Sequence, residues 1–146
     1  MKTAYLCPLA ALALASCGGP KEVTVDHGWV RLPVVAGRPA AAYFTLHGGK
    51  DGAILIGVSS PDATSAQMHE SMDMNGVSSM APLTQAVAPA GGAAKFAPGG
   101  KHVMLFGLKP GIAPGAKVRL HFAFADGKAI DTAAQAVAAT APVPGD

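Results

Sequence analysis

Apolar and polar residues along this chain alternate in short runs, and turn residues separate these runs at short intervals. A period of two is typical of a strand with one buried face, and no window keeps the period of an amphipathic helix. Asp126-Gly127 is also a two-residue hairpin signal. The alanine-rich stretch 129–139 has helical propensity, but its position after that hairpin favours a last strand. The pattern predicts nine strands, over residues 22–32, 40–47, 53–60, 64–70, 77–82, 84–87, 102–108, 117–125 and 128–137.

Many short strands with frequent turns are typical of a β-sandwich or a β-barrel. The composition agrees, because 14% charged residues, 18 Gly and 12 Pro fit a compact all-β domain better than a helical one. Residues 22–138 are predicted to form one domain, long enough to bury a core without disulfides, and 139–146 a flexible tail.

The first residues have the pattern of an export signal. One Lys precedes an apolar run that is too short to span a membrane, which predicts a signal peptide over 1–16. The run ends in Leu-Ala-Ser-Cys, which resembles a bacterial lipobox, so Cys17 is the expected lipidation site and 17–21 a short linker. Gly18 follows in place of an acidic residue, which favours the outer membrane. The alternative is an ordinary signal peptide cut elsewhere, with Cys17 incidental.

Removal of this leader changes the cysteine and charge balance. Cys7 would be lost and Cys17 acylated, so the mature domain would contain no thiol and no disulfide in an oxidising compartment. A blue-copper centre is thereby excluded, since its defining ligand is a Cys sulfur. Without Lys2, 10 basic residues stand against 9 acidic ones, a formal charge of +1. That balance gives no reason to expect nucleic acid or an anionic membrane surface as a partner.

The methionines are unevenly distributed. After the initiator, every Met lies between residues 68 and 104, and two of the five His share that window. Imidazole and thioether without thiolate form a ligand set for a soft or borderline metal, and Cu(I) is the first candidate because thioethers bind Zn2+, Mg2+ and Ca2+ poorly. The candidate ligands, spaced His-x10-Met-x21-His-x-Met, are His69, Met80, His102 and Met104.

The predicted strands allow these side chains to meet. His102 and Met104 point the same way along one strand, because side chains alternate between faces. A loop over 71–76 is expected to fold back and bring His69 and Met80 to one rim of the domain. The alternative is a Met-rich piece of core, since Met is a flexible gap-filler.

Three more methionines adjoin His69. Met68 alternates away from it and is predicted to lie in the core. Met72 and Met74 are expected in an exposed loop. There they would form an auxiliary site for copper capture or docking. The alternative is simple sequence variation of the loop, without a function. Glu70 would either orient the imidazole of His69 or be solvated.

The ligand spacing is similar to that of the periplasmic copper(I) chaperones of the PCuAC family, and the resemblance extends over about residues 21–138. His47 stands where relatives commonly have Asn, and the chain lacks the His/Met-rich tail of some relatives. The segments that carry the resemblance are Trp29-Val30-Arg31, Ala42-Tyr43-Phe44-Thr45-Leu46, Gly57-Val58-Ser59-Ser60 and Pro98-Gly99-Gly100-Lys101-His102-Val103-Met104-Leu105.

The resemblance implies a cupredoxin-like, immunoglobulin-like Greek-key β-sandwich that binds one Cu(I). It implies that His69, Met80, His102 and Met104 are the ligands. It also implies copper delivery towards respiratory cytochrome oxidase, with an oxidase copper subunit or a Sco-type protein as partner. A monomer on the periplasm-facing side of the bacterial envelope, attached only by its lipid, is expected.

Two other functions stay open. A copper-dependent redox enzyme would need an open coordination position and usually an acid or base, and Glu70 and Asp73 are the only carboxylates close in sequence. A non-metal binding or assembly module of the envelope would use the Met cluster as an apolar surface. We expect a carrier and not an enzyme.

Overall fold

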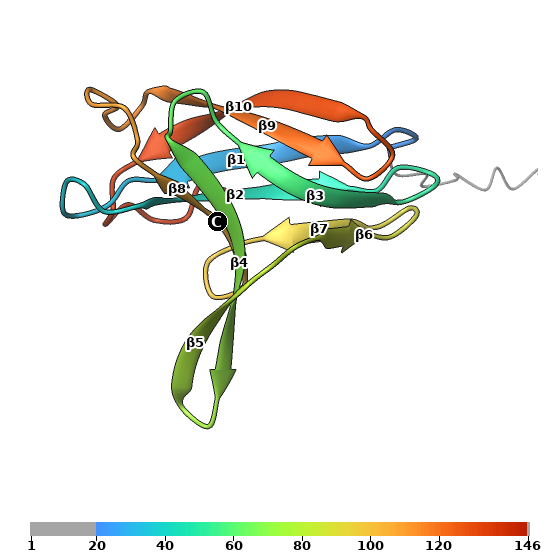
Figure 1. Ribbon diagram of the computed structural model, residues 1–146, viewed down its shortest axis with the longest axis horizontal. Helices are drawn as coiled ribbons and strands as arrows, with labels where there is room; N and C mark the ends of the chain where they lie inside the picture. Colours follow the sequence, from blue (N-terminus) through green and yellow to red (C-terminus); the bar gives the residue numbers. More distant parts are fainter. Residues whose placement is uncertain (1–19, 146) are drawn as a thin grey trace, which may run out of the picture.

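The computed structural model describes residues 20–145, which fold into ten strands (Figure 1). The predicted signal peptide and the predicted lipidation site, Cys17, lie outside the described residues. Within residues 20–145 no helix is long and apolar enough to span a membrane. The strands are β1 (Thr24–Arg31), β2 (Ala40–His47), β3 (Ala53–Ser59), β4 (Ser65–Met74), β5 (Val77–Pro82), β6 (Ala86–Ala88), β7 (Ala93–Phe96), β8 (Lys101–Phe106), β9 (Lys117–Phe124) and β10 (Ala129–Val137).

The strands form one sheet in the order β5-β4-β8-β7-β2-β1-β10-β9-β3-β6, with β8 also paired to β2. Most pairs are antiparallel, but β1 runs parallel to β10 and β7 parallel to β8. The sheet curls so far that β3 approaches β4 and β6 approaches β7, which makes two layers around one core. The predicted fold class, an all-β cupredoxin-like sandwich in one domain, is confirmed.

Strand alternation fills that core. In β9, alternate residues from Val118 to Phe124 are buried while their neighbours are not. The Phe44 ring stacks on Phe96 at 4.2 Å and meets the edge of Phe122 at 4.8 Å. Trp29, at 4.5 Å from the ring of Tyr43, is buried too. Large apolar rings from both layers therefore interlock, as dense packing requires.

Two sequence predictions about strands were wrong. The loop expected over 71–76 is strand as far as Met74, because β4 continues into a hairpin with β5. The turn of that hairpin is Asn75-Gly76, with positive φ at both residues, and Asn-Gly is the preferred pair there. The strand β7 was missed because Ala93–Phe96 has a weak alternation, with two Ala in four residues. The β4–β5 hairpin projects from the body as an arm (Figure 1).

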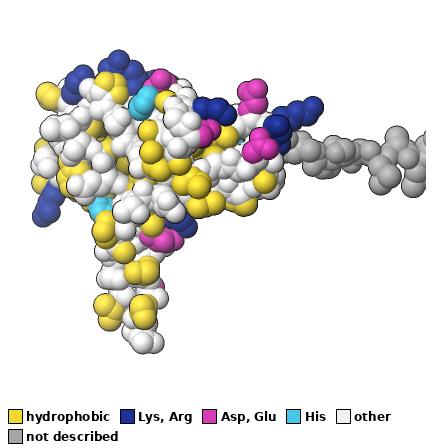
Figure 2. Space-filling model, turned by 45° about the vertical axis from the view of Figure 1, so that its right-hand side comes forward, with side chains coloured by type: hydrophobic (Ala, Val, Ile, Leu, Met, Phe, Trp, Pro, Cys, Tyr) yellow, Lys and Arg dark blue, Asp and Glu magenta, His cyan; other side chains and the backbone are white. Residues whose placement is uncertain are grey.

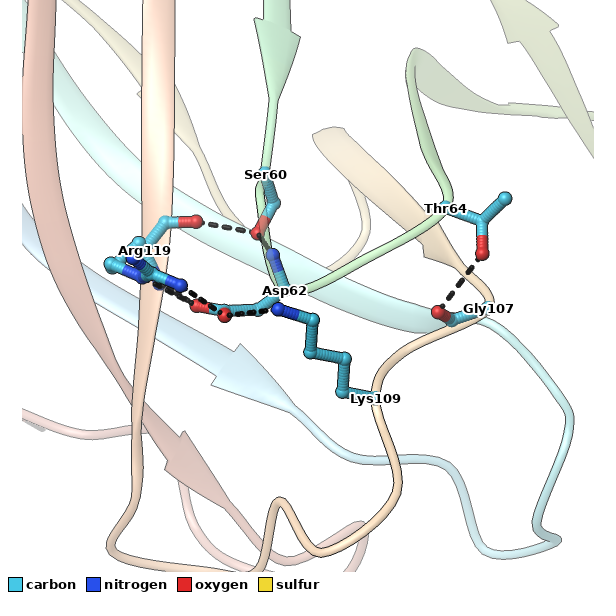
Figure 3. Close-up of polar contacts among 6 residues, drawn as sticks. All are labelled: Ser60, Asp62, Thr64, Gly107, Lys109 and Arg119. Carbon is cyan, nitrogen blue, oxygen red and sulfur yellow. Dashed lines mark hydrogen bonds and ion pairs between the residues drawn. The ribbon is translucent and has the colours of Figure 1, made fainter.

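The turn that leads into β4 is held by Asp62 (Figure 3). Its carboxylate accepts hydrogen bonds from the backbone N–H, Nε and Nη2 of Arg119 at 3.0, 3.1 and 2.7 Å. These bonds hold the pKa of Asp62 well below its usual range. The backbone N–H of Lys109 donates to the Asp62 carbonyl at 2.9 Å, and Thr64 Oγ1 donates to the Gly107 carbonyl at 3.3 Å. The start of β4 is thus fixed against the end of β8, the two strands that carry the candidate histidines.

Candidate metal centre

Strand register places all four predicted ligands on one face of the sheet. His69 of β4 lies directly opposite His102 of β8. In the same pair of strands Met104 lies opposite Gln67, two residues from His69. Met80 of β5 lies opposite Ser71, two residues from His69 in the other direction. Paired residues and alternate residues share a face, so four side chains from three adjacent strands point the same way.

Three of these side chains lie close together in the structure. The Nε2 atom of His102 lies 3.1 Å from the Sδ atom of Met80. The rings of His69 and His102 have centroids 5.9 Å apart. Met104 is half-buried on the same face, beside Gln67 on one side and Ala41 on the other.

The separation between nitrogen and sulfur suits a shared metal ion. Bonds of about 2.0 Å to nitrogen and about 2.3 Å to sulfur put the two donor atoms roughly 3.5 Å apart at a tetrahedral angle. The observed 3.1 Å between His102 Nε2 and Met80 Sδ is a few tenths shorter. A small rotation of the long Met80 side chain would provide the difference.

A hydrogen bond to the backbone determines which His102 nitrogen is free. Its Nδ1 atom lies 3.0 Å from the Gly100 carbonyl oxygen, which can only accept, so Nδ1 carries the proton. The same carbonyl accepts the backbone N–H of Ser71 at 3.0 Å, which fixes its position. In the neutral ring the Nε2 lone pair then faces the Met80 sulfur. Two lone pairs face each other there unless a cation, either a proton or a metal ion, lies between them.

Burial differs across the group. His102 is buried, with 7% of its surface exposed. The Nδ1 atom of His69 is buried without a hydrogen-bond partner among the described residues. An unpaired buried ring nitrogen is costly, and a metal ion would satisfy it. Met80, in contrast, is 58% exposed on the arm. The group is therefore anchored on its histidine side and open to solvent on its Met80 side.

The other candidates lie elsewhere. Met68 is buried in the core, as predicted. Met72 and Met74 are exposed, but they lie on a strand and share the face of Met68, opposite to that of His69. Glu70 pairs with Lys101 at 2.9 Å, so it neither orients His69 nor is fully solvated. Within residues 20–145 no three His, Cys, Asp or Glu side chains form a group able to hold a metal, so a centre here needs methionine sulfur.

One feature of this region was missed from the sequence. The Gly100 carbonyl, which fixes the His102 ring, is a backbone group that only the turn Gly99-Gly100 could have indicated. His47 has its Nε2 atom 2.9 Å from an Asp26 carboxylate oxygen, and His27 Nδ1 lies 2.7 Å from the other oxygen. These residues form a separate surface network away from the candidate ligands.

Comparison with known proteins gives the family. Residues 23–136 match the family described as "Putative lipoprotein LpqE-like". The chain belongs to this family. It is also 36% identical over 106 residues to the "Putative lipoprotein Lxx21020" of Leifsonia xyli subsp. xyli (strain CTCB07). That match covers 72% of the chain and 63% of the relative's length.

Solved structures confirm the resemblance to PCuAC domains. The copper-bound PCuAC domain from PmoF2 superposes with a TM-score of 0.65 at 22% identity, over 82% of this chain and 96% of that domain. The solution structure of apo-DR1885 from Deinococcus radiodurans gives 0.61 at 28% identity, over 94% of both chains. Its Cu(I) form gives 0.60 at 29% identity, over 87% of this chain and 85% of that one. The shared fold covers nearly all of the described residues.

Proposed function

We propose that this protein is a copper(I) carrier of the bacterial envelope. One Cu(I) is held by His69, Met80, His102 and Met104. The observation that carries the proposal is the short contact between His102 Nε2 and Met80 Sδ, at 3.1 Å, with the proton of the ring fixed on Nδ1. A metal ion between the two atoms would relieve the contact of their lone pairs, and a nitrogen–sulfur pair selects a soft ion.

The relatives support copper as the cargo. One solved structure of the same fold is a copper-bound PCuAC domain, and another is the Cu(I) form of DR1885. A set of neutral ligands without a thiolate also suits an oxidising compartment, where a thiol would be lost to disulfides.

The geometry favours transfer over storage. His69 and His102 are fixed on paired strands of the body, whereas Met80 lies on the exposed side of the arm. An incoming ligand from a partner can approach on that side and displace the thioether first. We propose that the copper passes to a copper-accepting oxidase subunit or to a Sco-type protein.

We also propose that the carrier is anchored in the envelope and is not an enzyme. Cys17 is lipidated, and the protein is a monomer on the periplasm-facing side of the envelope, with the outer membrane favoured. A redox enzyme is disfavoured because Glu70, one of two nearby carboxylates, is committed to Lys101. The non-metal assembly module is disfavoured because it gives no role to the unpaired nitrogen of His69.

A second, weaker copper site is proposed on the arm. Met72 and Met74 lie two residues apart on one face of β4, and both are exposed. They share no face with His69, so they cannot complete the first coordination sphere. They would capture Cu(I) before it reaches the main centre.

Competition for Cu(I) with a chromogenic chelator tests the main centre. The variants Met80→Leu and His102→Ala should each weaken Cu(I) binding by at least about tenfold. The reason is that even a group that only hydrogen-bonds to a metal ligand contributes about 10–100-fold to metal affinity. Met68→Leu is the matched control, since Met68 lies in the core and not on the ligand face. Equal affinity in Met80→Leu and Met68→Leu, with both folded, would contradict the assignment. Transfer from the loaded protein to an apo oxidase copper domain, followed by NMR, tests delivery.

A further inference from the structure

A groove lies at the end of the domain where the chain enters the fold. It has a volume of about 1200 Å³ and is lined by the first described residues, by the turn between β2 and β3 and by the turn between β9 and β10. Lys21 and Glu22 form part of its wall. The β1–β2 turn lies at the opposite end of the body, and the β4–β5 arm projects to one side (Figure 1).

Beside this groove the outer face of the sheet is apolar. Ile54 of β3 pairs with Val87 of β6, and both side chains line the groove and are exposed, Val87 to 56%. Ile56 is exposed on the same strand. Hydrophobic side chains gather on this side of the body, next to the charged residues near the chain's beginning (Figure 2). Further along β9 the outer face becomes polar at His121. Along the outer face of β3 and β9 the apolar surface therefore lies towards the end where the chain enters.

The charges around the groove cancel. Three lysines and three carboxylates line it, and two of the pairs are in contact. Lys50 Nζ lies 3.5 Å from Asp51, and Lys128 Nζ lies 3.4 Å from Asp126. A partner attracted by charge, such as a polyanion or a strongly anionic surface, finds no net charge here. The surface suits an uncharged apolar partner instead.

The length of chain before the groove identifies that partner. Cys17 precedes Lys21 by four residues, which span at most roughly 14 Å when fully extended. We propose that this apolar end rests on the lipid bilayer that holds the Cys17 anchor, with Ile54, Ile56 and Val87 in the interfacial region. The short linker keeps this end of the domain near the bilayer surface, where exposed apolar side chains add to the attachment in proportion to the area they bury. The inference rests on the proposed lipid anchor. In this orientation the arm and Met80 extend sideways from the docked end, free to meet a partner.

Tryptophan quenching by brominated lipids tests the contact. The protein contains one native Trp, Trp29, which is buried and gives a constant background. Val87→Trp places a probe in the apolar face, and Val34→Trp places a matched probe at the opposite end, where Val34 is 83% exposed. The full protein is expressed in a bacterium with lipoprotein processing and reconstituted into vesicles of brominated phosphatidylcholine. Mass spectrometry first establishes whether Cys17 carries lipid. If it does not, the free thiol is coupled to a maleimide phospholipid, so failure of the anchor is separated from failure of docking.

Quenching of Val87→Trp but not of Val34→Trp is the expected result. Adding Ile54→Ser and Ile56→Ser to Val87→Trp should abolish it, and adding phosphatidylglycerol should leave it unchanged. Equal quenching of both probes, or of neither, overturns the proposal. Quenching that needs phosphatidylglycerol also overturns it, because the surface carries no net charge. A shift of the Trp emission of Val87→Trp with protein concentration in the absence of lipid, without quenching on vesicles, would assign the surface to a second copy of the chain. That result would overturn the bilayer contact.

Discussion

Replacing Asp62 with Asn removes the charge from a carboxylate that joins three parts of the fold. The side chain is 11% exposed and accepts three hydrogen bonds from Arg119, with Lys109 Nζ 3.6 Å away. Asn keeps the shape but offers one acceptor oxygen, so the donors of Arg119 lose a charged partner. The turn before β4 and the segment after β8 would then be held less firmly.

The magnitude follows from these contacts. A buried donor left without its partner costs about 1–3 kcal/mol. The Arg119 guanidinium is largely exposed and regains water, so we expect Asp62→Asn to lower the free energy of unfolding by about 2 kcal/mol. For residues 20–145, an unfolding entropy of about 2.1 cal/mol/K per residue amounts to about 0.26 kcal/mol/K. Asp62→Asn should therefore lower Tm by roughly 8 °C at pH 7.

The pH dependence separates charge from packing. The pKa of Asp62 is lowered in the folded protein from an unfolded value of 3.8, so its stabilisation is complete above pH 3.8. It is lost as the pH falls below 3.8 towards the folded pKa, by about 1.4 kcal/mol per pH unit. Thermal unfolding followed by circular dichroism should show a stability difference between the wild-type protein and Asp62→Asn. This difference should be constant between pH 7 and pH 4 and should shrink below pH 4.

The control is Asp131→Asn, because Asp131 is exposed and its side-chain hydrogen bond is to His121. It should change the stability by less than about 0.5 kcal/mol. A difference for Asp62→Asn that persists undiminished at pH 2.5 would refute the electrostatic reasoning. A difference at pH 7 no larger than that of the control would refute the role of Asp62 altogether.

Three further outcomes are expected. Gly107→Ala should destabilise the protein by about 2 kcal/mol in denaturant unfolding, because φ is +60° and the new Cβ would collide with Thr64 Oγ1. Phe122→Ala should cost about 3–5 kcal/mol by the same measurement, since the ring is fully buried in the core, and a cost below about 1 kcal/mol would mean that the core is misassigned. The double variant Met72→Leu/Met74→Leu should lose a second, weaker equivalent of Cu(I) while keeping the first. Methionine methyl NMR signals of the wild-type protein report both sites. If the signals of Met72 and Met74 do not change at two equivalents of Cu(I), the second site does not exist.

Most of the fold was predictable because alternation is a local property. In β9 and β8 the period of two identified which residues face the core, and both strands lie within two residues of their predicted ends. The strand β7 was not predictable, since its two alanines give little contrast between faces and it forms by pairing with distant β2. The extension of β4 was a different error, because the Asn75-Gly76 signal was present in the sequence.

The sequence by itself determined the chemistry of this protein: a thiol-free domain with two imidazoles and two thioethers at fixed spacing, and strand alternation that puts His102 and Met104 on one face. The tertiary structure decided which methionines accompany the histidines. Register between β4, β5 and β8 puts Met80 beside His102 and turns Met72 and Met74 to the other face. The reason is physical. Alternation relates residues within one strand, whereas register is set by pairing between strands that are far apart in the chain.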